Sequence, residues 1–225
     1  MNYVSRSRYF HGSTVDRALL VKRRSSLWAR KGVVFIHVPK AAGTSISESL
    51  YGRFTGHVRA SDVLRWASAA VRSLPRVAVV RNPWSRLVSA YRFIKRGRGI
   101  GGPNAGRVWR AEQYDIPEFD TFETFVNDWL ASQNLGALDE AFQPQSPFVS
   151  DRRGDIIVDH LGRVESLEPT YEYLADRVQP LEPFGRSNRS GDPVDYRRFY
   201  TPELIDRVGK IYADDVRILR YGFED

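Results

Sequence analysis

The chain has 225 residues, 42% of them hydrophobic, and a formal net charge of +7 at pH 7, which indicates one globular domain. It has no run approaching the roughly 18 apolar residues of a membrane span, and its lack of cysteine excludes disulfides and cysteine-ligated metal sites. The excess positive charge predicts an anionic partner, either nucleic acid, an acidic polymer or a small polyanion. The N-terminal residues lack the apolar core of a signal peptide, so we expect a cytoplasmic protein.

The N-terminal residues 1–31 are polar and basic, with the cationic runs Lys22-Arg23-Arg24 and Arg30-Lys31. They show no strong period, so we expect an irregular arm or a short helix, with its charges solvated or touching an anionic partner. Residues 32–225 contain no internal repeat and no low-complexity linker, and we expect them to form a single domain.

The most informative stretch covers residues 33–45, VVFIHVPKAAGTS. Its apolar, β-branched start is typical of a buried strand in a parallel sheet, and Pro39 ends that strand. The helical spacing of Ile46, Leu50 and Tyr51 predicts a helix directly afterwards. The loop between strand and helix consists of Lys40, Ala41, Ala42, Gly43, Thr44 and Ser45.

This strand–loop–helix arrangement suits an anion. Small residues let backbone N–H groups approach a phosphate or sulfate, the helix N-terminus adds about half a positive charge, and Lys40 adds a whole charge. In the nucleotide P-loop the lysine follows the glycines, whereas here Lys40 precedes Gly43. The stretch is therefore not a Walker motif. Two interpretations stay open: a phosphate or sulfate cradle, or a turn with a solvated lysine.

The next segment, GRFTGHVR, carries His57 in a link bracketed by Gly52 and Gly56. A helix should follow, with Ser61 as its N-cap and Pro75 just beyond its end. His57 therefore lies in a short loop between two helices. The alternative is a histidine that only packs at a helix entry.

A second buried strand is predicted over residues 76–81, RVAVVR. Asn82 suits the N-cap of the next helix and Pro83 its first position, and the helix should continue from Trp84 to Ile94.

Two strand–helix units joined by a helical crossover imply a parallel sheet. We therefore predict an α/β fold, P-loop-like, in which helices flank a central parallel sheet in three layers. Because ligands bind at the carboxyl ends of such strands, Lys40 and Arg81 should share one edge.

The remaining chain is expected to alternate between loops and short elements. In order, these are a glycine-rich basic loop over 95–106, a helix capped by Thr121, a proline-broken connection over 141–151, a strand over 155–165, a helix over 169–178, a polar loop over 180–193 with Arg186 and Arg189, and a last helix capped by Thr201 and Pro202.

The motif RNPWSRLVSAY, residues 81–91, is the partner of the first stretch. Arg81 leaves a strand end and Ser89 lies two helical turns into the following helix. An arginine fork with a hydroxyl can hold a terminal phosphate. The chain then offers two anion sites on one sheet edge, which would fit a nucleotide with phosphates on both sides of its ribose. Arg86 could join this site or form a salt bridge.

With these two motifs the chain resembles the sulfotransferases that use 3′-phosphoadenosine-5′-phosphosulfate (PAPS), and most of all the carbohydrate branch with heparan sulfate 2-O-sulfotransferase. FIHVPKAAGTS is similar to that family's 5′-phosphosulfate loop, and RNPWSRLVSAY to its 3′-phosphate motif. Looser similarity extends through GHVRASDVL, FQPQS, GRVESLE and the YRRFYTPELIDRVGKIYADD tail, so it covers roughly residues 33–225.

The resemblance implies roles for particular residues. Lys40 would neutralise charge on the bridging oxygen, and the backbone from Ala41 through Ser45 would hold the 5′-phosphate, although Thr44 and Ser45 also suit helix caps. Arg81 and Ser89 would hold the 3′-phosphate. Arg186 and Arg189 would close over the nucleotide, although a solvated loop is the simpler interpretation of these two arginines. No metal cofactor is expected.

The general base is expected to be His57, because an imidazole that titrates near ~6.5 can accept a proton from a hydroxyl at neutral pH. A histidine in a similar Gly-His-Val stretch is the proposed base of the 2-O-sulfotransferases. Glu48 is the rival, since other sulfotransferases use a glutamate. Gln143 and Gln145 either face the acceptor or belong to a turn. The acceptor should be a hydroxyl compound, with an anionic carbohydrate as the candidate.

Two other functions remain as alternatives. A nucleotide kinase would need Mg²⁺ and a Walker lysine, and a nucleic-acid-binding module would show phosphate contacts with steep salt dependence.

Overall fold

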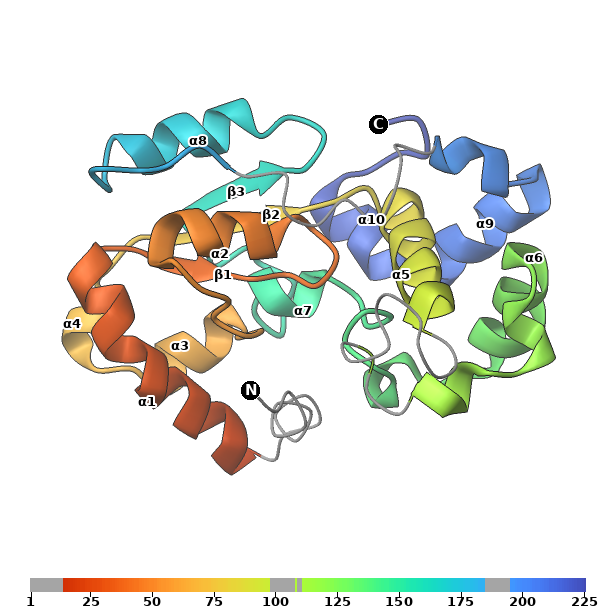
Figure 1. The fold of residues 1–225 in the computed structure, drawn as a ribbon, viewed down its shortest axis with the longest axis horizontal. Coiled ribbons are helices and arrows are strands. Elements are labelled where there is room, and N and C mark those ends of the chain that lie inside the picture. Colours follow the sequence, from red (N-terminus) through yellow and green to blue (C-terminus); the bar gives the residue numbers. More distant parts are fainter. Residues whose placement is uncertain (1–13, 98–107, 109–110, 185–194) are drawn as a thin grey trace.

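The computed structural model describes residues 14–97, 108, 111–184 and 195–225. At its centre lies a parallel sheet of three strands in the order β1-β2-β3, with β1 at Val34–Ile36, β2 at Arg76–Val80 and β3 at His160–Arg163 (Figure 1). The central strand β2 pairs Val77 with Phe35 on one side and with His160 on the other. Both neighbours of β2 are parallel to it, so the carboxyl ends of all three strands share one edge.

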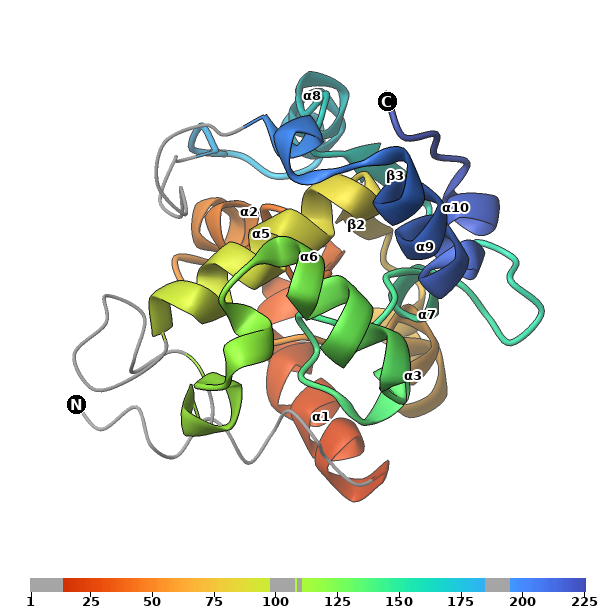
Figure 2. The same ribbon diagram turned by 90° about the vertical axis from the view of Figure 1, so that its right-hand side faces the viewer.

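The described residues also form ten α-helices. They are α1 Thr14–Lys31, α2 Gly43–Tyr51, α3 Ala60–Trp66, α4 Ala69–Arg72, α5 Pro83–Gly97, α6 Phe122–Thr124, α7 Ser146–Val149, α8 Glu168–Ala175, α9 Pro202–Ile211 and α10 Ala213–Leu219. Helix α8 lies along β3, while α1, α3 and α4 gather on the β1 side (Figure 1). Helix α5 packs against α9, with α6 beside it in the turned view (Figure 2). None of the described helices is long and apolar enough to cross a bilayer.

The predicted α/β class and the parallel sheet are confirmed. The P-loop-like, three-layer arrangement stays a prediction. Local capping signals were also right: the side chains of Asn82, Thr121 and Thr201 accept hydrogen bonds from the first turns of α5, α6 and α9.

The N-terminal segment differs from its prediction. Residues 14–31 form one helix of 18 residues, α1, instead of an irregular arm or short helix. Val21 and Trp28 are fully buried and lie two turns apart on the same face. They join the main core, which holds α1 against α2, α3 and α4. The division of the chain at residue 32 stays a prediction.

The helix predicted after His57 is wrong in its cap and its length. The N-cap of α3 is Arg59, so Ser61 lies inside the first turn. Ala67 is extended and ends α3, and Ser68 then caps α4 through its side-chain oxygen. A serine hydroxyl that accepts from a backbone N–H offers the chain an alternative to continuing the helix.

Three later boundaries also differ. The strand predicted over 155–165 is shorter, because only His160–Arg163 pairs with β2. Helix α5 extends to Gly97, into the predicted glycine-rich loop, whose residues 98–106 lie outside the described part. The connection over 141–151 contains α7.

One buried tyrosine fixes α2 over the sheet. The Tyr51 hydroxyl accepts a hydrogen bond from Phe35 N at 3.0 Å and donates one to Val33 O at 3.0 Å. Burial raises the pKa of this hydroxyl, so it stays protonated and keeps both bonds. Strand β1 and the C-terminal end of α2 are thereby locked together, which sets the position of the loop that joins them.

Candidate active site

The segment that leads from β1 into the first turn of α2, residues 38–45, is called the cradle loop below. Lys40 and Ala42 have positive φ angles of 65° and 57°. A left-handed conformation costs a non-glycine residue roughly 1–2 kcal/mol, and such strain concentrates at functional sites. The N-cap residue of α2 is Ala42, which has no side-chain oxygen to accept from the first-turn N–H groups. Thr44 and Ser45 are therefore first-turn residues and not the N-cap.

Gly43 is required by a close approach. A Cβ at this position would lie 2.1 Å from Cδ2 and 2.5 Å from Nε2 of His37. Only a residue without a side chain can place its backbone against this ring. His37 is buried, with 3% of its surface exposed. Burial, with smaller contributions from His57 and Lys40, holds the pKa of His37 well below its ordinary value, so this imidazole is neutral.

The Lys40 ammonium contacts α5. Its Nζ lies 3.9 Å from the centroid of the Phe93 ring, a cation–π contact. Phe93 belongs to α5, the helix that starts from the second predicted motif. The two motifs that the sequence singled out therefore meet in space.

Arg81 follows β2 directly, and its Nε donates a hydrogen bond to Ser85 Oγ at 2.9 Å. Burial is the main reason that the pKa of Arg81 is lowered, with Glu165 opposing it. The guanidinium keeps its charge, so an anion here would offset the cost of desolvation. Ser85 and Ser89 are buried on α5 and are four residues apart, which puts them on one face of the helix. Ser85 was missed, although its i+4 spacing from Arg81 was readable.

One face of α5 connects the two motifs. Ser85, Ser89 and Phe93 repeat every four residues, so they form one stripe along the helix, about 12 Å from first to last at 1.5 Å per residue. Arg81 contacts the first member of the stripe and Lys40 the last.

The backbone of Arg81 is held by Gln145. Arg81 N donates to Gln145 Oε1 at 2.9 Å, and Gln145 Nε2 donates to Arg81 O at 2.7 Å. The buried Asp215 in turn accepts from the N–H groups of Gln145 and Ser146 at 2.8 Å and 2.7 Å. Gln145 is fully buried, and it supports Arg81 from a distant part of the chain, a role that neither of its interpretations, an acceptor contact or a turn, included.

The start of α5 is fixed by Glu165, just after β3, and by residues from the end of the chain. Glu165 accepts from Asn82 N at 2.8 Å and from the Tyr221 hydroxyl at 3.0 Å. The Asn82 side-chain amide donates to Gly222 O at 2.8 Å and to Asp225 O at 3.1 Å. These contacts set the direction in which Arg81 leaves the sheet.

Arg86 neither joins Arg81 nor forms a salt bridge in the described structure. It is 1% exposed and donates to Ala141 O at 3.0 Å and to Gln143 O at 2.7 Å. Its guanidinium also lies 5.5 Å from the centroid of the Tyr212 ring. Arg86 therefore clamps the segment around residues 141–143 against α5.

His57 lies beside His37, with ring centroids 4.6 Å apart and planes at 89°. Phe54 touches both rings edge-on, at 5.5 Å from His57 and 5.1 Å from His37. Nδ1 of His57 lies 2.7 Å from Glu140 Oε2. Glu140 was missed, because nothing in its local sequence connects it to a histidine 83 residues away. His57 is thus brought near the cradle loop through His37, whose ring lies under Gly43.

Glu48, the rival base, is exposed on α2. Arg186 and Arg189 lie outside the described residues. Gln143 is buried and donates to Leu138 O at 2.8 Å, and it accepts from Arg59 Nη2 at 3.4 Å. It therefore contributes to a turn, as the simpler interpretation predicted.

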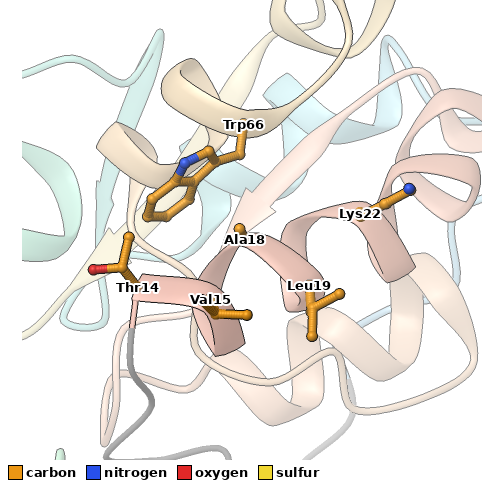
Figure 3. Close-up of a pocket in the computed structure, with 6 residues that line it drawn as sticks. All are labelled: Thr14, Val15, Ala18, Leu19, Lys22 and Trp66. Atoms are coloured by element: carbon orange, nitrogen blue, oxygen red, sulfur yellow. The ribbon is translucent and has the colours of Figure 1, made fainter.

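The described residues contain no group of three or more histidine or acidic side chains that could hold a metal ion. A groove of about 410 Å³ lies between α1 and Trp66 of α3 (Figure 3). Its lining is Thr14, Val15, Ala18, Leu19, Lys22 and Trp66, and no residue of the two motifs contributes to it.

Comparison with known proteins gives one finding. The family model described as the Sulfotransferase family matches residues 28–222. Neither the comparison with curated proteins nor that with solved structures gives a match. The matched region contains the cradle loop, the Arg81 motif and His57, and it spans most of the 225 residues. The chain belongs to the sulfotransferase family.

Proposed function

We propose that the protein transfers a sulfuryl group from PAPS to a hydroxyl of an acceptor, a carbohydrate or glycoconjugate as in the branch with heparan sulfate 2-O-sulfotransferase. Membership of the sulfotransferase family supports the reaction type. The single observation that supports the donor is the α5 stripe, because it joins a cation at each end, Arg81 and Lys40. A ligand with one anionic group on each side of a ribose would contact both.

The cradle loop would receive the 5′-phosphosulfate. Its two left-handed residues let successive N–H groups converge on an anion, and the α2 N-terminus adds a favourable dipole. Lys40 would leave the Phe93 ring for the bridging oxygen, where negative charge grows as the bond to sulfur breaks. Such a contact strengthens toward the transition state and therefore accelerates transfer.

The Arg81 end would receive the 3′-phosphate. Arg81 offers a fork of N–H donors, and Ser89 adds a hydroxyl one turn beyond Ser85, which already holds the Arg81 side chain. In-line displacement also requires that the acceptor hydroxyl lose its proton. His57 would take that proton, since its ring packs on His37, whose ring lies against Gly43 of the cradle loop.

A transfer assay tests this proposal. Purified protein with PAPS labelled in its sulfuryl group would be incubated with glycans, lipids, small phenols and peptides in the presence of EDTA. Label should move to hydroxyl-bearing acceptors without divalent metal. No transfer to any acceptor class, together with phosphoryl transfer from ATP–Mg²⁺, would replace the proposal by the kinase alternative.

A further inference from the structure

His57, the proposed base, forms a close contact with the carboxylate of Glu140. His57 Nδ1 and Glu140 Oε2 are 2.7 Å apart, and each side chain is only 15% exposed. A carboxylate can only accept a hydrogen bond, so Nδ1 must carry the proton and donate it. In the neutral ring this leaves the lone pair on Nε2.

The segment that carries Glu140 is anchored by Arg86 and by a hydrogen bond within itself. Arg86 donates to the carbonyl of Ala141, the next residue, and to that of Gln143. Asp139, the residue before, accepts from Ala141 N at 3.0 Å. Glu140 is thus held from α5, the same helix that carries Ser85 and Ser89. The base and the proposed 3′-phosphate site share one rigid support.

The His57 ring is also fixed on its faces and edges. His37 and Phe54 meet it at right angles, at centroid distances of 4.6 Å and 5.5 Å. Because His37 is neutral, it adds no repelling charge when His57 takes up a proton. Glu140 therefore supplies the negative charge that faces an imidazolium at this position.

We propose that Glu140 is a positioning residue for His57. It accepts the Nδ1–H hydrogen bond, holds the tautomer with the lone pair on Nε2, and stabilises the imidazolium formed during transfer. In that step the acceptor O–H proton moves to Nε2, the acceptor oxygen bonds to sulfur, and the bond from sulfur to the bridging oxygen breaks, its electron pair staying on the 5′-phosphate. The proton stays on the imidazole and does not pass to Glu140, as in a serine protease triad. This inference rests on the proposed function.

The first test is spectroscopic and needs no acceptor. The full chain, labelled with ¹⁵N in its four histidines, would be studied by long-range ¹H–¹⁵N correlation at pH 8, with His57→Asn identifying the His57 signals. The wild type should show protonated Nδ1 and unprotonated Nε2. In Glu140→Leu, which removes the acceptor, the proton should move to Nε2, while Glu140→Gln should retain the wild-type tautomer through its amide oxygen.

The second test is kinetic. Glu140→Leu should lower kcat about 10- to 100-fold, a part of the 10²–10⁴ that a general base contributes, with the affinity for adenosine 3′,5′-bisphosphate (PAP) unchanged. Glu140→Gln should recover part of the loss, and Glu123→Gln, an exposed carboxylate on α6, should match wild type.

A wild-type ring protonated on Nε2 would overturn the inference without any variant. So would a Glu140→Leu protein whose tautomer or kcat equals wild type. Failure of the proposed function would look different, because the wild type itself would then not bind PAP.

Discussion

At the scale of single residues, Lys40 and Arg81 should have separable roles. Lys40→Ala should lower kcat roughly 10²- to 10³-fold, as for loss of one donor to developing charge, and change PAP affinity little. Arg81→Ala should instead weaken PAP binding about 10- to 100-fold, since a charge-assisted hydrogen bond contributes about 1.5–3 kcal/mol and its phosphate partner changes little during transfer.

Steady-state kinetics and PAP titration of both variants check this division. Phe93→Leu is the matched control for Lys40, because it removes the ring that Lys40 contacts and keeps the ammonium. If Lys40→Ala changed only donor affinity, the role of Lys40 at the bridging oxygen would be refuted.

His57 and Glu48 can be compared directly. His57→Asn should lower kcat about 10²- to 10⁴-fold, the usual loss for a general base, because the imidazole packed against His37 would be gone. Glu48→Gln should stay close to wild type, since Glu48 is exposed on α2. Turnover with a fixed acceptor, alongside PAP affinity, measures both. An active His57→Asn beside an inactive Glu48→Gln would transfer the role to the glutamate.

At the scale of elements, the cradle loop depends on the absence of a side chain at Gly43. Gly43→Ala would bring a Cβ to 2.1 Å from the His37 ring, so the loop must shift and PAP affinity should fall at least tenfold. Adding His37→Ala should restore part of that affinity, because it removes the clashing ring. Gly136→Ala is the control, since its nearest contact would be 3.4 Å away.

Calorimetric titration with PAP measures all four proteins. Equal affinity of Gly43→Ala and wild type would show that the loop geometry does not matter for the anion.

The link between β1 and α2 is also testable. Tyr51→Phe leaves Phe35 N and Val33 O without their hydroxyl partner, and unsatisfied buried groups cost about 1–3 kcal/mol each. The free energy of unfolding in urea should therefore fall by about 2–6 kcal/mol, the sum over the two groups. Tyr173→Phe, which keeps the ring stacked on His160, should change it little. A Tyr51→Phe protein as stable as wild type would mean that water or a local shift replaces these bonds.

How much of this structure the sequence could predict depends on the range of the interactions. The caps at Asn82, Thr121 and Thr201 use side chains two or three residues from their partners, so local pattern was sufficient. The length of helix α1 was missed because only two of its apolar residues, Val21 and Trp28, are fully buried in a basic segment, with Leu20 and Leu27 partly buried. Its packing partners α2, α3 and α4 come later in the chain.

The candidate site shows the same division. Lys40 and Arg81 were readable because each follows a strand that the pattern predicts, and parallel strands bring their carboxyl ends to one edge. The roles of Gln145, Glu140 and Asp215 were not readable, since they act on residues about 64 to 83 positions away. Gln145 and Asp215 contact backbone groups of their partners. Every residue has such groups, so the identity of the partner residue does not indicate the contact.

At the scale of the whole molecule, the chain alone must form both of the proposed anion sites. They lie at the ends of β1 and β2 and are joined by α5, so one ligand should stabilise the sheet and this helix together. A ligand that binds only the folded state at one hundred times its Kd adds about 2.7 kcal/mol to the free energy of unfolding.

The most direct measurement is thermal unfolding with PAP in EDTA, with ATP–Mg²⁺ and an oligonucleotide as comparators and Arg81→Ala as the variant control. The account predicts that PAP raises Tm of the wild type without metal, by clearly more than either comparator, and that the rise is much smaller in Arg81→Ala. No rise at saturating PAP, or a rise that requires Mg²⁺, would contradict it.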